Sequence, residues 1–177
     1  MIIERIKKDE ILSQYVEDTC CENEICVTFD DQIPFDSYAI IKVDKFYNSL
    51  NIEHRPASID CLIIRKCIDG GYGMTLVELK NIKSSSAFEF ENIKEKFETT
   101  LFDFIKKKFK ELLDIDYTEI KLFFVSKNEI YKRDLGLKME TLMEIRFKFN
   151  DKTLMITPKM PNPTIKNCYA KKISVVI

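Results

Sequence analysis

The stretch from Arg55 to Asn81 constrains the fold of this 177-residue chain more than any other. It contains two apolar runs separated by a short segment that holds three of the chain's four glycines, at positions 70, 71 and 73. Asp69-Gly70 is a strong hairpin signal, because glycine supplies the positive φ that strand-matching turns require. The sequence therefore predicts a β-hairpin whose apolar strands are covered on both faces.

This hairpin brings three polar side chains together. Asp60 stands at the start of the first strand, and Glu78 and Lys80 stand at the end of the second. Cross-strand neighbours lie about 4.5–5.5 Å apart at Cβ, and residues 78 and 80 share a face because strands repeat every two residues. A buried carboxylate pair is costly unless a cation compensates it. We therefore expect Asp60 and Glu78 to hold a divalent metal ion, with Lys80 beside it.

Asp60 followed by Glu78-Leu79-Lys80 on the next strand resembles the signature of the PD-(D/E)XK nuclease superfamily, which has the restriction-endonuclease-like fold. Pro56 precedes Asp60 by four residues, whereas the family's proline stands next to its aspartate. The resemblance covers residues 38–126. It implies a metal-dependent endonuclease or exonuclease that hydrolyses phosphodiester bonds of nucleic acid, with DNA as the expected substrate.

The resemblance also implies roles for individual residues. Asp60, Glu78 and the carbonyl of Leu79 are expected to bind Mg²⁺ or Mn²⁺, since magnesium prefers hard oxygen ligands. Asp60, Glu78 and Lys80 are the expected catalytic residues. Lys80 would position the nucleophile or stabilise the negative charge that develops at the phosphate.

The expected fold class is α/β, a central mixed sheet flanked by helices in a single domain over residues 1–177. The predicted order is helix, strand, strand, strand, helix, strand, over the core at 38–126 with a C-terminal β extension at 127–177. We expect a first helix at 2–17, a short strand at 25–29 and core strands at 38–43 and 119–125. In the extension we expect a hairpin of 142–149 with 153–157, against a competing helix at 134–147, and an edge strand at 173–177.

The long helix after the hairpin has the clearest periodicity in the chain. Ser86 and Glu89 fit a capping box at its start. Apolar residues then recur every fourth position, at Ile93, Phe97, Leu101, Ile105 and Phe109. Lysines lie on the opposite side, and Lys83, Lys94 and Lys96 are the candidates for contact with a phosphate backbone. The alternative is an ordinary solvated face.

Composition limits the partners and the compartment. The net charge of −1 provides no overall basic surface for nucleic acid. No apolar run approaches the ~20 residues of a membrane span, and the first residues do not resemble a secretory signal. We therefore expect a cytoplasmic protein without membrane contact. Its six cysteines are then expected to be free thiols, with a thiolate metal site as the alternative for Cys20, Cys21, Cys26 and Cys168.

Several further candidates stay open. Glu4 or Glu10 in the first helix is a candidate additional acid, and His54, the only histidine, is a candidate ligand or base. A second Glu-x-Lys occurs at Glu119 to Lys121, but it has no hairpin-partner aspartate.

The main functional alternative is a catalytically inactive, nuclease-like scaffold subunit with a protein partner, and a homodimer is expected if two DNA strands must be cut. The third alternative is a different α+β fold, in which Asp60 and Lys80 form a cross-strand salt bridge.

Overall fold

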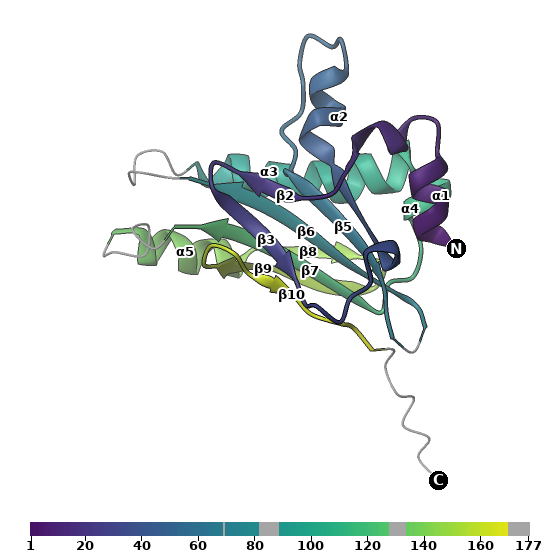
Figure 1. The fold of residues 1–177 in the computed structure, drawn as a ribbon. Helices are drawn as coiled ribbons and strands as arrows, with labels where there is room; N and C mark the ends of the chain where they lie inside the picture. The colour runs from purple at the N-terminus through teal and green to yellow at the C-terminus, as the bar shows by residue number, and fades with distance from the viewer. Residues whose placement is uncertain (69, 82–88, 128–133, 170–177) are drawn as a thin grey trace.

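The computed structural model describes residues 1–68, 70–81, 89–127 and 134–169. Its centre is a seven-stranded mixed sheet in the order β1-β4-β5-β6-β7-β9-β8. Helices pack on one face of this sheet, and a three-stranded sheet in the order β10-β3-β2 lies on the other (Figure 1). The predicted mixed sheet flanked by helices is confirmed, with the α- and π-helices of the described residues packed on one face.

The elements follow one another along the chain with few long connections. The strands are β1 Val16–Glu17, β2 Cys20–Glu22, β3 Ile25–Phe29, β4 Tyr38–Lys42, β5 Cys61–Lys66, β6 Tyr72–Lys80, β7 Glu119–Ser126, β8 Arg146–Phe149, β9 Lys152–Lys159 and β10 Thr164–Ile165. The helices are α1 Ile2–Lys8, α2 Val43–Ser49, α3 Phe90–Glu98, the π-helix η4 Thr99–Lys108, α4 Lys110–Leu113 and α5 Asp134–Glu144, with 3-10 turns η1 Leu12–Tyr15 and η2 Phe35–Ser37.

The predicted hairpin forms the middle of the sheet. β5 and β6 pair antiparallel from Cys61 opposite Val77 to Lys66 opposite Tyr72. Gly70 and Gly71 have φ of 100° and 73°, the left-handed values that the turn needs. β7 then pairs parallel to β6. Because both faces of the hairpin are covered, most of its side chains are buried.

The predicted long helix contains a π-helical middle. Its five apolar residues at four-residue spacing are all buried against the sheet. In a pure α-helix of 3.6 residues per turn, each such step drifts by about 40° around the axis. The wider π turns of η4 compensate for this drift, so the apolar stripe stays on one side. Its predicted cap, Ser86, lies outside the described residues, and α3 begins at Phe90.

The N-terminal part of the chain differs from the prediction. The helix expected over 2–17 ends at Lys8. The Asp9 carboxylate there accepts hydrogen bonds from the backbone N–H groups of Ile11 and Leu12, which diverts the backbone from the helix. The strand expected to reach Val43 ends at Lys42, and the unpredicted helix α2 begins at Val43. This helix interrupts the predicted succession of three strands.

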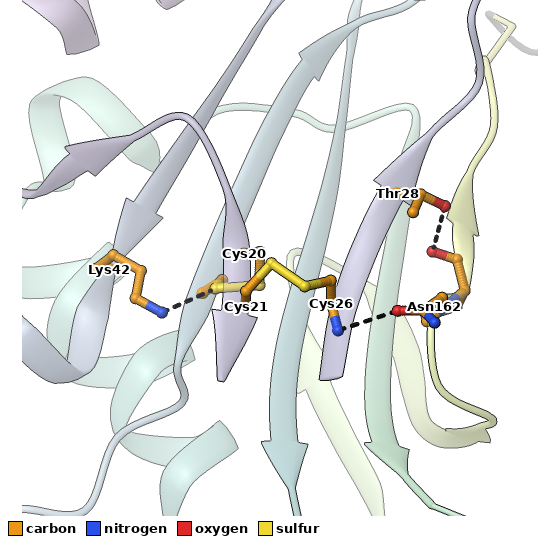
Figure 2. Close-up of a disulfide and its surroundings, with 8 residues drawn as sticks. Cys20, Cys21, Cys26, Thr28, Lys42 and Asn162 are labelled. Carbon is orange, nitrogen blue, oxygen red and sulfur yellow. Dashed lines mark hydrogen bonds between the residues drawn. A yellow bond between two sulfur atoms is a disulfide. The ribbon is translucent and has the colours of Figure 1, made fainter. Parts of the chain in front are cut away.

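The cysteines are paired, so the prediction of free thiols was wrong. The structure contains the disulfides Cys20–Cys61, Cys21–Cys26 and Cys67–Cys168. The first two are shown in Figure 2: Cys20–Cys61 attaches the small sheet to the central one, and Cys21–Cys26 joins β2 to β3 within the small sheet. These bridges use all six thiols, which also removes the alternative of a thiolate metal site.

The C-terminal region contains both of the elements that the sequence left in competition. Helix α5 occupies part of the expected range 134–147, and the hairpin of β8 and β9 follows it. β9 pairs parallel to β7 and extends the central sheet. The edge strand expected at 173–177 lies outside the described residues. Within the described ranges, no helix combines the length and apolar character that crossing a membrane requires.

Candidate active site

Asp60 and Glu78 lie on neighbouring strands at one end of the central sheet. The β5–β6 ladder ends with Cys61 opposite Val77, so the same register places Asp60 opposite Glu78. Residues 60, 62 and 64 share the face of residues 74, 76 and 78, because strands alternate their side chains. Leu62 and Leu76 on that face pack in the helix-covered core. The hairpin therefore brings both carboxyl groups to the helical side of the sheet.

The Asp60 side chain serves as a hydrogen-bond acceptor for the backbone of β6, just beyond the end of the β5–β6 ladder. Its Oδ2 accepts a hydrogen bond of 2.6 Å from the backbone N–H of Leu79. Burial raises the pKa of Asp60 to about 6, while the Leu79 hydrogen bond and the charge of Lys96 act in the opposite direction. The Asp60 carboxyl group therefore loses its proton at a higher pH than an ordinary carboxyl group does.

Glu78 is more strongly perturbed. It is fully buried, and its Oε1 accepts a 2.6 Å hydrogen bond from Lys96 Nζ. Burial, and then the charge of the neighbouring Asp60, raise the pKa of Glu78 to about 8. The ion pair with Lys96 acts against this shift but is outweighed by burial. Its other oxygen, Oε2, is buried and has no hydrogen-bond partner among the described residues.

The amine that contacts Glu78 is Lys96 of α3, whereas the sequence assigned that position to Lys80. Lys80 is half-buried at the end of β6, and its positive charge lowers the pKa of Glu78 only as the weakest contribution. Lys96 was expected to contact a phosphate backbone. In the structure it is mostly buried and is bound to Glu78. Its own pKa is raised by the charges of Glu78 and Asp60, although its burial acts in the opposite direction.

Asp44 is an acid at this site that the sequence reasoning missed. It lies in the first turn of α2, directly after β4, and its charge raises the pKa of Asp60. Its Oδ1 is buried and unpartnered within the part of the chain that the structure describes. The sequence signal was an aspartate directly after the predicted strand at 38–43. Its position near Asp60 depends on helix α2, which the sequence analysis did not predict.

The site partly fits a divalent metal ion. Two buried carboxyl groups with raised pKa and an unpartnered Glu78 oxygen favour a cation as the ligand of this site. With the Leu79 carbonyl they provide hard oxygen donors of the kind that Mg²⁺ prefers. Over the described ranges, however, no group of three His, Cys, Asp or Glu side chains is close enough together to hold a metal.

The other predicted residues lie apart from this site. Glu4 and Glu10 are exposed, and neither contributes to the pKa shifts of Asp60 or Glu78. His54 is exposed in the loop before Asp60. Lys94 pairs with Glu98 at 3.9 Å. Lys83 lies outside the described residues.

The chain was also compared with known proteins. No family model, curated protein or solved structure matches it. The functional argument therefore depends on the geometry and electrostatics of the side chains themselves.

Proposed function

We propose that this protein is a metal-dependent nuclease of the PD-(D/E)XK type. The observation that carries the proposal is the pair of buried carboxyl groups, Asp60 and Glu78, on adjacent strands with raised pKa values. Strongly perturbed acids that meet in one place are characteristic of functional sites. A purely structural core would place apolar side chains at these positions.

The finer fold assignment belongs to the same proposal. The restriction-endonuclease-like core is supported by the succession of α1, β4, β5, β6, α3 and β7, with α2 as an insertion. β4, β5 and β6 pair antiparallel in turn, and β7 returns parallel to β6 after the helical crossover.

In this proposal each residue has a separate role. Asp60 and Glu78, with the Leu79 carbonyl, hold Mg²⁺ or Mn²⁺, and Lys80 interacts with the attacking water or with the phosphate. The ion, when bound, supplies Lewis-acid activation of water and neutralises charge at the phosphate. Lys96 keeps one Glu78 oxygen neutralised and oriented, which leaves Oε2 as the available donor. DNA is the proposed substrate.

One observation favours the alternative of an inactive, nuclease-like scaffold. Lys96 already forms an ion pair with Glu78, and only two carboxylates meet directly across the hairpin. An internal lysine is a way to stabilise such a site without a metal. In this alternative the partner would be a protein, and metal ions would have no effect on the folded chain.

A plasmid-nicking assay with Mg²⁺ or Mn²⁺ separates the two proposals. The informative variants are Asp60→Asn, Glu78→Gln and Lys80→Ala; asparagine retains an oxygen that can accept the Leu79 hydrogen bond. Each is expected to lower the nicking rate by about 100-fold or more. Lys66→Ala, at the exposed far end of β5, is the matched control and should cleave normally.

Two outcomes would contradict the nuclease proposal. Folded wild-type protein that nicks DNA with neither ion would favour the scaffold. Cleavage that survives all three substitutions would locate the chemistry elsewhere in the chain. Thermal stabilisation by Mn²⁺ in the wild type but not in Glu78→Gln would support metal binding independently of turnover.

A further inference from the structure

A second site lies on the opposite face of the central sheet. A cavity of about 330 Å³ opens there between β6, β7 and β9 and the small strand β10. Its sheet residues, including Thr75 and Phe123, occupy the odd-numbered positions of β6 and β7, so they face away from the helices and from Glu78. This volume is within the range of ordinary small-molecule pockets.

The lining of this cavity is strongly cationic. Four of its described lining residues are cationic, namely Arg65, Lys121, Lys159 and Lys166, and none of them is acidic. Glu119 forms ion pairs with both Arg65 and Lys121. Among the described lining residues, positive charge therefore exceeds negative charge, in a chain whose total charge is −1. An anion is the ligand that such a lining favours.

Arg65 is the cation of this site that is held most firmly by its neighbours. Its side chain is 1 % exposed, and Nη1 donates a 3.1 Å hydrogen bond to Thr75 Oγ1 while Nη2 bonds Glu119. Its Nε is buried and has no partner among the described residues. Since a buried unpaired donor is costly, negative charge brought into the cavity would stabilise the guanidinium.

The surroundings of Arg65 fix its position. A Cβ at residue 73 would lie 2.9 Å from Arg65 Cζ and 3.0 Å from Cys168 Sγ, so Gly73 provides the space in which the guanidinium rests. Cys168 is bonded to Cys67, next to the end of β5. The arginine is therefore held between the glycine of one strand and a disulfide, and it is pre-organised for a ligand.

Hydroxyl groups complete the lining. Thr75, Thr157 and Thr164 line the cavity beside the cations. Lys159 Nζ lies 5.1 Å from the centre of the Phe123 ring. Planar guanidinium, ammonium and hydroxyl donors together form the set that binds phosphate oxygens.

From this geometry we propose that the cavity binds a small phosphorylated molecule of about nucleotide size. Lys121 and Lys159 bond the phosphate from the walls, and the buried guanidinium of Arg65 beneath them adds positive charge at the floor. A nucleic-acid strand is not the proposed ligand, because the cations converge on one cavity of about 330 Å³, which accommodates a small molecule and not a polymer backbone. The proposal does not depend on the nuclease proposal, since the two sites lie on different faces.

Isothermal titration calorimetry of the full chain tests this proposal. The ligands are inorganic phosphate, pyrophosphate, AMP and ATP, with adenosine as the uncharged control and sulfate as the general-anion control. AMP or ATP is expected to bind, phosphate to compete with it, and adenosine to show no binding. Separate phosphate and nucleotide titrations distinguish a site for the free ion from a site for the whole nucleotide.

Variants then locate the binding. Lys159→Met and Lys121→Met are each expected to weaken binding by about 10-fold or more. Lys152→Met is the matched control on the same strand as Lys159, because its amine pairs with Asp116 outside the cavity. Asp60→Asn should bind phosphate normally whether or not it abolishes DNA cleavage.

Three results of the calorimetry with small ligands overturn the proposal. These are no binding of any phosphorylated ligand, equal binding of sulfate, or equal losses in Lys159→Met and Lys152→Met. Binding of an oligonucleotide without binding of nucleotides would also overturn it, in favour of a nucleic-acid surface. Circular dichroism of each variant establishes that it is folded before its affinity is compared.

Discussion

The same tripeptide pattern, Glu-x-Lys, occurs on two neighbouring parallel strands with opposite results. Glu78 lies near the end of β6 on the helical face, fully buried, beside a second acid and one lysine. Glu119 lies at the start of β7 on the other face, with its side chain 33 % exposed and paired with Arg65 and Lys121. The first site holds excess buried carboxylate and suits a cation. The second holds excess positive charge and suits an anion.

The difference shows that the pattern alone does not determine the chemistry. Burial and the charges on neighbouring strands decide which ion each site favours. Asp60 supplies the second acid at the first site, and Arg65 supplies the additional cation at the second. Each site also lies beside its own disulfide, Cys20–Cys61 at the first and Cys67–Cys168 at the second.

Removal of disulfides gives the largest expected effect. Cys67 and Cys168 are 101 residues apart, whereas Cys21 and Cys26, which belong to neither site, are 5 apart. In the loop-entropy model, losing the long bridge costs about 4–5 kcal/mol and losing the short one about 2 kcal/mol. Chemical denaturation of Cys67→Ser/Cys168→Ser against Cys21→Ser/Cys26→Ser measures the difference. Equal losses would contradict the assigned pairing.

Activity gives the next largest effect and separates the two glutamates directly. Glu78→Gln is expected to lower metal-dependent DNA nicking by about 100-fold or more, because it removes a proposed metal ligand. Glu119→Gln should nick normally, since Glu119 lies on the other face of the sheet. Initial rates on supercoiled plasmid measure both. Comparable losses in the two variants would mean that the sites are not functionally distinct.

The dependence of stability on pH should differ between the same two variants. The raised pKa values of Asp60 and Glu78, about 6 and about 8, mean that the folded protein holds protons which the unfolded chain releases. Stability contributed by this protonation is complete below the ordinary carboxyl pKa and is lost as pH rises towards about 8. Glu78→Gln should reduce this decline by several °C in Tm.

Calorimetric melting from about pH 5 to about pH 9 measures this change, with Glu119→Gln as the control that retains the wild-type slope. A Glu78→Gln profile parallel to that of the wild type would show that Glu78 is charged throughout this range.

The smallest expected effect is the change in the pKa of Glu78 when Lys96 is replaced. Lys96→Met should raise the pKa of Glu78 further, because the ion pair lowers it, but burial remains the larger cause. Lys94→Met is the matched control, because Lys94 lies two residues before Lys96 on α3 and pairs with Glu98. Carbon-13 NMR titration of the Glu78 carboxyl measures the shift. A pKa that falls in Lys96→Met would contradict the assigned interaction.

The sequence was sufficient to predict the parts of this molecule that local signals encode. The glycine turn defined the β5–β6 hairpin and its register, and through it the proximity of Asp60 and Glu78. The apolar stripe defined the long helix. The contact of Lys96 with Glu78 could not be predicted from local signals, because it depends on how α3 crosses the sheet. Asp44 was missed because helix α2, which holds it near Asp60, was not predicted.

The cysteines were misjudged for a different reason. Their pairing was argued from the expected compartment, and the three bridges follow instead from which strands are adjacent. Cys20 and Cys61 meet because the small sheet packs on β5, a contact between segments 41 residues apart. Lys42 Nζ lies 3.6 Å from Cys61 Sγ in the same buried environment (Figure 2).

The π-helical segment has a consequence for how this chain tolerates a change of length. The wider turns of this segment hold more residues per turn than α-helical turns do, so one deletion within 99–108 would be absorbed as the remaining turns narrow towards about 3.6 residues. Phe109 and Leu113 would then stay in the apolar interior, and Lys96, which precedes the segment, would keep its contact with Glu78. A single-codon deletion would thus be tolerated in this segment, whereas the same deletion in the α-helical turns before it would rotate the apolar stripe away from the sheet.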